Sequence, residues 1–200
     1  NTYIKGAVIS GNFNPNTMIV WINKAYCKDG YAYLTPFSSK RASLVLAVTD
    51  ATDSEIDKYW EVFLYRENLK FVIEEEFKIN HASGYVYPHK IGNIFLTGNA
   101  AGMIDPFLGF GIFGSVVSGV MAARSIMHNL DYEKLLQKIV KHNLRLLEFR
   151  KALNSTSNAG YDFLVTSIGV PGLKHLLYYT PLNVIKLGSG IFKIMSFKKP

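Results

Sequence analysis

The chain has 200 residues, of which 48% are hydrophobic and 18% charged, and it contains 13 Phe, 12 Tyr and 2 Trp. This composition excludes an intrinsically disordered chain, because such chains are poor in aromatic residues and rich in charge. Cys27 is the single cysteine, which excludes a disulfide framework and a multi-cysteine zinc site and favours a reducing compartment. The sequence starts at Asn1 rather than Met, and we expect this residue to be the cut end of a longer chain.

The net charge of +7 is concentrated after Asp162, the last acidic residue. Residues 163–200 contain five lysines and no arginine, among many Leu, Ile, Phe and Tyr side chains. A basic, apolar segment of this kind suits an anionic membrane surface better than nucleic acid. A pair of apolar helices that covers the core explains the same composition, and both interpretations stay open.

Pro106–Ala123 is a charge-free stretch of 18 residues, and it just reaches the length that suggests a membrane span. Pro106 and four glycines interrupt it, so that only its second part can form a regular helix. We therefore predict no transmembrane span, and we expect a cytoplasmic protein that is peripheral at a membrane where the basic segment contacts one.

The first half of the sequence is typical of β-strands. β-branched and aromatic runs alternate with turn-rich pieces, at Tyr3–Ser10, Met18–Asn23, Tyr31–Thr35 and Ser43–Val48. Asp53 is expected to cap a helix that ends near Asn68. Further strands are predicted at Lys70–Asn80 and Ile94–Thr97.

The second half is predicted to be helical. One helix covers Ile112–Asn129, Asp131 caps a second helix that ends near Asn154, and short helical pieces follow Gly160. The fold class is therefore α+β, with an antiparallel substrate-domain sheet, a strand–loop–helix segment and a helical carboxy-terminal region. We place these three parts at residues 1–90, 91–128 and 129–200.

Gly109–Gly114 matches the pattern GxGxxG. A dinucleotide fingerprint needs a strand directly before this pattern and a βαβ unit around it. The predicted strand ends at Thr97, and the helix after the glycines leads to another helix. The fingerprint interpretation is therefore rejected.

The whole stretch from Gly98 to Ala123 instead resembles the second flavin motif of FAD-dependent oxidoreductases with the hydroxybenzoate-hydroxylase fold. The family pattern is approximately GDAAG, then PxxGxGI, then a helix with SG and AA. The matching pieces are Gly98-Asn99-Ala100-Ala101-Gly102, Asp105-Pro106-Phe107-Leu108-Gly109-Phe110-Gly111-Ile112, Ser118-Gly119 and Ala122-Ala123. Within this group the sequence is most similar to the geranylgeranyl reductase family, whose YxWxFP signature resembles Tyr31-Ala32-Tyr33-Leu34-Thr35-Pro36.

The resemblance implies FAD as cofactor, with the backbone of residues 109–112 at the pyrimidine edge of the flavin, Pro106 beside the ring and Asn99 near the ribityl chain. The implied cofactor-binding residues are Gly98, Asn99, Ala100, Ala101, Gly102, Pro106, Gly109, Phe110, Gly111 and Ile112. Tyr31, Tyr33 and Pro36 would bind an apolar, lipid-like substrate. The resemblance assigns no catalytic side chain and no metal ligand.

The sequence departs from the family pattern at three positions. Asn99 replaces the aspartate of the flavin motif, while Tyr33 and Thr35 replace tryptophan and phenylalanine of the second signature. The βαβ unit that holds the ADP half of FAD is not among these 200 residues. The resemblance therefore implies the carboxy-terminal part of a longer flavoprotein, whose partner is its amino-terminal FAD-binding domain and whose own FAD site is incomplete.

The function implied is hydride transfer from reduced flavin to a carbon–carbon double bond of an isoprenoid or isoprenoid-lipid substrate. A flavin-dependent monooxygenase or halogenase of the same fold is one alternative, and a non-catalytic module that binds lipid or a membrane surface is another. Cys27 is expected to be structural. His81 and His89 are too loosely spaced for a metal site, and we expect both at the surface.

Overall fold

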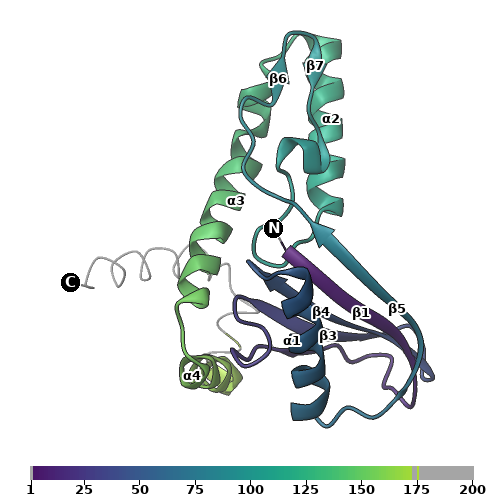
Figure 1. Cartoon of the computed structure of the whole chain (residues 1–200). Coiled ribbons are helices and arrows are strands. Elements are labelled where there is room, and N and C mark those ends of the chain that lie inside the picture. The colour runs from purple at the N-terminus through teal and green to yellow at the C-terminus, as the bar shows by residue number, and fades with distance from the viewer. Residues whose placement is uncertain (1, 173–174, 176–200) are drawn as a thin grey trace. The chain divides into compact units, whose positions relative to one another are not determined.

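The structure is a computed structural model that describes residues 2–172 and 175 (Figure 1). Contacts divide the chain into two compact units, the first formed by residues 1–82 and 156–165 and the second by residues 83–155 and 166–200. The fold class is α+β, as the sequence predicts. The predicted division of the chain into three functional parts, with boundaries at residues 90 and 128, stays a prediction.

The first unit is built on one antiparallel sheet with the strand order β2-β3-β4-β1-β5. Its strands are β1 (Thr2–Ser10), β2 (Ile19–Trp21), β3 (Gly30–Pro36), β4 (Arg41–Thr49) and β5 (Val72–His81). All five predicted strands of this sheet are confirmed, although β2 is shorter than expected. It ends early because Asn23 starts a turn, in which its carbonyl oxygen accepts hydrogen bonds from the amides of Tyr26 and Cys27.

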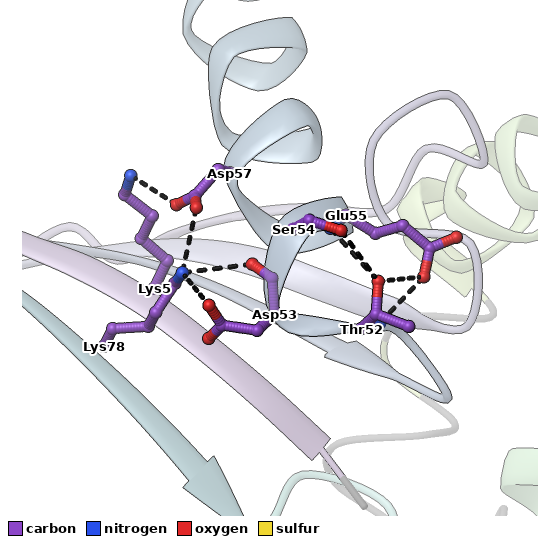
Figure 2. A network of polar contacts seen from close by, with 7 residues as sticks. All are labelled: Lys5, Thr52, Asp53, Ser54, Glu55, Asp57 and Lys78. Atoms are coloured by element: carbon purple, nitrogen blue, oxygen red, sulfur yellow. Dashed lines mark hydrogen bonds and ion pairs between the residues drawn. The ribbon is translucent and has the colours of Figure 1, made fainter.

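Helix α1 (Asp53–Arg66) covers one face of this sheet. Its cap is Thr52 rather than the predicted Asp53, because Thr52 and Glu55 form a capping box in which each side chain accepts a hydrogen bond from the other residue's amide. Lys78 on β5 adds a polar link, since its Nζ atom lies 2.9 Å from Asp57 and 3.1 Å from the Asp53 carboxylate (Figure 2). The helix is thus attached to the sheet at its first turns.

Alternation along the strands divides the side chains of the sheet between two faces. One face packs on Ile56, Trp60 and Phe63 of α1, with a core that contains Ala7, Ile9, Ala32, Leu34, Leu44, Leu46 and Val48. Cys27 belongs to this core, where its Sγ atom lies 3.0 Å from the carbonyl oxygen of Asn23. The opposite face carries Tyr31 and Tyr33, so the two tyrosines point away from α1.

The second unit contains a two-stranded antiparallel sheet and two long helices that pack side by side (Figure 1). Its elements are β6 (Lys90–Ile91), β7 (Ile94–Phe95), the short 3-10 helix η1 (Gly98–Ala101), α2 (Ile112–His128) and α3 (Tyr132–Asn154). The predicted cap of α3 is confirmed, because the Asp131 side chain accepts a hydrogen bond from the amide of Lys134. The core between these elements contains Ala101, Met103, Ala122, Tyr132 and Leu136.

Helix α4 (Asn158–Gly169) begins two residues before Gly160, where short helical pieces were expected. The five lysines of residues 163–200 lie outside the described residues, and the predicted membrane contact of that segment therefore stays a prediction. Among the helices that the structure describes, none is long and apolar enough to cross a membrane.

Candidate functional site

The first part of the candidate site is the turn Gly98–Gly102, which is stabilised by its own backbone. The amide of Gly102 donates to the carbonyl oxygen of Asn99, and the amide of Met103 donates to that of Gly98, both at 2.9 Å. Gly98 and Gly102 have φ angles of +57° and +65°, a left-handed conformation that only glycine adopts at little cost. Asn99 and Ala100 are exposed on this turn, whereas Ala101 is buried.

The second part of the site is the loop between Asp105 and Gly111. Hydrogen bonds from residues of this loop to Asp105 hold it closed. Its Oδ1 atom accepts hydrogen bonds from the amides of Phe107 at 2.6 Å and Leu108 at 3.1 Å. Its backbone carbonyl oxygen accepts from Gly109, and its amide donates to the carbonyl oxygen of Phe110. Asp105 thus organises the loop, a role the sequence motif did not assign, although an aspartate before proline is a known turn signal.

Gly109 lies at the open side of this loop. Its φ angle is +74°, and a Cβ atom added to it would meet nothing within 4 Å in the described part of the chain. This side of the loop is therefore open at Gly109. Pro106, which the motif places beside the flavin ring, is half-buried in the same loop.

The third part is the start of α2, which has no side-chain cap at Gly111. The amide of Ser115 donates to the carbonyl oxygen of Gly111 at 2.9 Å, so the amides of Ile112, Phe113 and Gly114 precede the regular hydrogen bonding of the helix. Uncapped amides and the positive end of the helix dipole suit an electron-rich ligand edge. Ile112 and Phe113 are exposed beside them.

The buried side chains of Ser118 and Tyr132 connect the glycine turn to helices α2 and α3. The Ser118 hydroxyl accepts a hydrogen bond from the amide of Gly98 at 2.9 Å, and the Tyr132 hydroxyl donates to the carbonyl oxygen of Leu96 at 2.7 Å. Burial and, to a smaller extent, the neighbouring Glu133 raise the pKa of Tyr132, so its hydroxyl is a neutral donor at physiological pH. The sequence had marked Ser118 only as part of the SG pair and had not marked Tyr132.

His89 is not a surface residue as predicted, because it is only 2% exposed. The first turn of α3 places Glu133 against it, with one carboxylate oxygen 2.7 Å from the His89 amide and the other 2.6 Å from Nδ1. His81, at the end of β5, is half-buried rather than exposed. Among the described residues, no group of three or more His, Cys, Asp and Glu side chains could hold a metal ion.

The predicted substrate residues lie in the first unit, whereas all ten predicted cofactor residues lie in the second. Tyr31 and Tyr33 stack on each other with ring centroids 5.8 Å apart, and burial raises the pKa of Tyr33. Pro36 is paired with Ala42 of the core, so strand alternation places it on the opposite face from the tyrosines. The structure therefore groups the two tyrosines and leaves Pro36 apart from them.

Comparison with known proteins finds curated relatives and solved structures that are similar to this chain, whereas no family model matches. The digeranylgeranylglycerophospholipid reductase of Methanocaldococcus jannaschii is 27% identical over 172 residues, which cover 77% of this chain and 44% of that protein. Digeranylgeranylglycerophospholipid reductase 2 of Methanothermobacter thermautotrophicus is 25% identical over 198 residues, which cover 91% of this chain and 51% of the relative. The chain thus spans about half the length of these relatives.

The solved structures show the fold. A geranylgeranyl bacteriochlorophyll reductase-like protein from Thermoplasma acidophilum matches 93% of this chain with a TM-score of 0.69 and 22% identity, over 53% of its own length. The flavin-dependent brominase Bmp2 matches 98% of this chain with a TM-score of 0.63 and 13% identity, over 55% of its own length. The chain is related to the FAD-dependent oxidoreductase fold and is distantly similar to digeranylgeranylglycerophospholipid reductases over their carboxy-terminal half.

Proposed function

We propose that this chain is the carboxy-terminal part of an FAD-dependent oxidoreductase that reduces carbon–carbon double bonds of an isoprenoid or isoprenoid-lipid substrate. One structural observation carries the proposal: α2 starts without a side-chain cap, directly after the loop that Asp105 holds closed. The similarity of the chain to digeranylgeranylglycerophospholipid reductases supports it. When bound, FAD supplies the hydride transfer. The residues of the candidate site would bind FAD and orient it.

The residues present fit a flavin ring. Gly109 leaves open space beside the loop, and the backbone amides of Phe110, Gly111 and Ile112 would hold the electron-rich edge of the ring, because the Gly109 amide already donates to Asp105. Asn99, exposed on the neighbouring turn, would contact the ribityl chain, because an amide can both donate to and accept from a hydroxyl group. Gly98, Ala100, Ala101 and Gly102 would bring the turn close to the ligand.

An amino-terminal FAD-binding domain is the partner that this proposal requires. The second unit exposes several large apolar side chains on β6, β7 and α2, namely Ile91, Ile94, Ile112, Phe113, Val116 and Val120. Exposed apolar side chains of this size are available for contact with another domain, and the relatives are about twice as long as this chain. We propose that the amino-terminal domain covers this surface and completes the FAD site, which is incomplete in this chain.

The face of the sheet that carries Tyr31 and Tyr33 is the proposed substrate surface. Val45 and Phe77 belong to the same face by register, opposite Tyr33 and Gly6 respectively. These side chains are aromatic or aliphatic, and they suit an apolar chain rather than a charged substrate. We further propose a cytoplasmic location with peripheral contact to an anionic membrane, from which such a lipid would come.

Two other functions remain candidates. The structural similarity to a flavin-dependent brominase favours a monooxygenase or halogenase of the same fold. Asn99 in place of the aspartate of the flavin motif favours a non-catalytic module that binds lipid or a membrane surface. These alternatives differ in whether flavin is bound and in whether oxygen is consumed.

The deciding experiment uses the complete product of the gene that encodes this chain. We expect the purified protein to show the visible absorption of a flavin and, after anaerobic reduction, to be reoxidised by a lipid with geranylgeranyl chains. Mass spectrometry of that lipid would show added pairs of hydrogen atoms. Oxygen-dependent hydroxylation or bromination would overturn the reductase in favour of the first alternative, and a complete protein that binds no flavin would favour the second.

A titration of the 200-residue chain with FAD tests whether the amino-terminal domain is required for FAD binding. We expect FAD to bind it weakly or not at all, because the remaining backbone contacts contribute only about 0.5–1.5 kcal/mol each and must first offset the entropy of immobilising a large ligand. Submicromolar, stoichiometric binding, followed by flavin fluorescence, would show that no further domain is needed.

A further inference from the structure

Two buried hydroxyl groups hold the backbone directly before the Gly98–Gly102 turn. Ser118 on α2 is fully buried and accepts the hydrogen bond of the Gly98 amide at 2.9 Å. Tyr132, the first residue of α3, is 2% exposed and donates to the carbonyl oxygen of Leu96 at 2.7 Å. Leu96 and Gly98 lie two residues apart on the same short segment. Helix α2, through Ser118, therefore determines the position of the Gly98 amide, and helix α3, through Tyr132, determines the position of the Leu96 carbonyl group.

Ser118 also connects this segment to the beginning of α2. Its oxygen lies 2.7 Å from the carbonyl oxygen of Gly114 and 3.1 Å from that of Ser115, so the hydroxyl donates to the backbone of the preceding helical turn. Gly114 in turn is in close contact with Met103, the residue that follows the turn, because a Cβ atom added at Gly114 would overlap the Met103 carbonyl oxygen. The entrance and the exit of the turn are therefore both attached to the first two turns of α2.

The Tyr132 hydroxyl has a second neighbour, the carbonyl oxygen of Ser118 at 3.3 Å. The shorter contact identifies Leu96 as the acceptor of its single hydrogen. The ring packs edge-on against Phe95 with centroids 5.2 Å apart. Side chains that are locked by both packing and hydrogen bonds keep their neighbours within a narrow range of positions.

We propose that Ser118 and Tyr132 are positioning residues of the cofactor site, which set the place of Asn99 relative to the amides at the start of α2. This inference rests on the proposed function, in which the turn and the helix start contact different parts of one ligand. Two contacts on a rigid ligand both form well only if their separation is fixed in advance. Ser118 and Tyr132 act through the backbone and touch no ligand themselves.

The test compares Ser118→Ala and Tyr132→Phe with two matched controls in the complete gene product. Ser125→Ala removes a buried hydroxyl from the same helix, where Ser125 donates to the carbonyl oxygen of Leu130 at 2.6 Å. Tyr26→Phe removes the hydroxyl of another buried tyrosine, which donates to Glu67 at 2.6 Å in the first unit. The measurements are the dissociation constant of FAD, the absorption spectrum and midpoint potential of the bound flavin, and the melting temperature.

We expect Ser118→Ala and Tyr132→Phe each to weaken FAD binding about tenfold, the equivalent of one typical hydrogen bond, and to shift the flavin spectrum. The controls should lose melting temperature to a similar extent while FAD affinity changes by less than about twofold. Hydrogen exchange of the Gly98 amide should accelerate in Ser118→Ala and stay slow in Ser125→Ala. Tyr132→Phe keeps the ring against Phe95 and decides the question if Ser118→Ala does not fold.

The inference is overturned if the wild-type protein binds flavin while Ser118→Ala and Tyr132→Phe match their controls in FAD affinity, spectrum and potential. Ser118 and Tyr132 would then be structural residues only. A wild-type protein that binds no flavin is a different result: it overturns the proposed function and, with it, the positioning role. The exchange rate of the Gly98 amide still shows in that case whether Ser118 holds the turn.

Discussion

The carbonyl oxygen of Met103 lies against the Cα atom of Gly114, at a distance that leaves no room for a side chain at position 114. We predict that Gly114→Ala destabilises the protein by about 1–3 kcal/mol, since the helix or the turn must shift to admit a methyl group. Gly119 on the same helix is the control, because a Cβ atom there would meet nothing within 4 Å. Gly119→Ala should be neutral or stabilising by up to about 1 kcal/mol. Denaturant unfolding measures both, and equal effects would contradict the prediction.

Asp105 is predicted to keep the loop before α2 closed. Asp105→Ala removes the oxygen that accepts from the amides of Phe107 and Leu108, at a cost of about 1–3 kcal/mol. We expect chymotrypsin to cleave faster after the aromatic residues of this loop and FAD affinity to fall. Asp105→Asn retains an acceptor and should stay close to wild type. An Asn variant that is cleaved as fast as the Ala variant would contradict this role.

The Asp57 carboxylate is predicted to make stability sensitive to acid. Hydrogen bonds, first from Lys5 and then from Lys78, lower the pKa of Asp57 (Figure 2). A carboxyl group whose pKa is lower in the folded state stabilises the protein above its ordinary pKa, and this contribution is lost as pH falls through the folded value. Asp57→Asn should therefore be less stable than wild type at pH 7, and the difference should shrink below about pH 4.

The control for that titration is Glu61→Gln, which changes an exposed residue of the same helix. We expect its stability at pH 7 to lie within about 0.5 kcal/mol of wild type, as is usual for an exposed surface substitution. Thermal unfolding at a series of pH values measures all three proteins. A difference between Asp57→Asn and wild type that stays constant down to pH 2 would show that the Asp57 carboxylate does not carry the effect.

Glu133 is predicted to be required for the buried position of His89. Glu133→Ala leaves the amide and the ring nitrogen of His89 without their shared acceptor, and an unsatisfied buried group costs about 1–3 kcal/mol. Glu133→Gln keeps one acceptor oxygen and should lose less stability. Urea unfolding of both variants, together with His89→Ala and the double variant, yields the coupling energy of the pair. A coupling energy near zero would contradict the prediction.

Tyr33 is predicted to contact the apolar substrate. Tyr33→Ala should raise the KM for an isoprenoid lipid about tenfold or more, because it removes a large apolar contact area, while FAD affinity stays unchanged. Tyr65→Ala, which removes an exposed ring from α1, should leave KM unchanged. Steady-state kinetics of the complete gene product would measure the change. Equal KM values for wild type and Tyr33→Ala would remove Tyr33 from the substrate surface.

The sequence alone predicted the elements whose signals are local. Alternating β-branched and aromatic residues identify the strands of the large sheet, and Asp131 identifies the start of α3, because periodicity and capping depend only on neighbouring residues. The glycines at 98, 102 and 109, which belong to the resembled flavin motif, all have positive φ angles. The capping box of Thr52 and Glu55 was also present as T-x-x-E and could have corrected the predicted cap at Asp53.

Tertiary structure decided the contacts between residues that are distant in the chain. Ser118 reaches Gly98 across 20 residues, Tyr132 reaches Leu96 across 36, and Glu133 reaches His89 across 44. None of these pairs has a local signature, since each depends on how α2 and α3 pack against the segment before the glycine turn. The same holds for the buried state of His89. Patterns of neighbouring residues determine secondary structure, whereas the partner of a buried polar group is determined by which elements pack together.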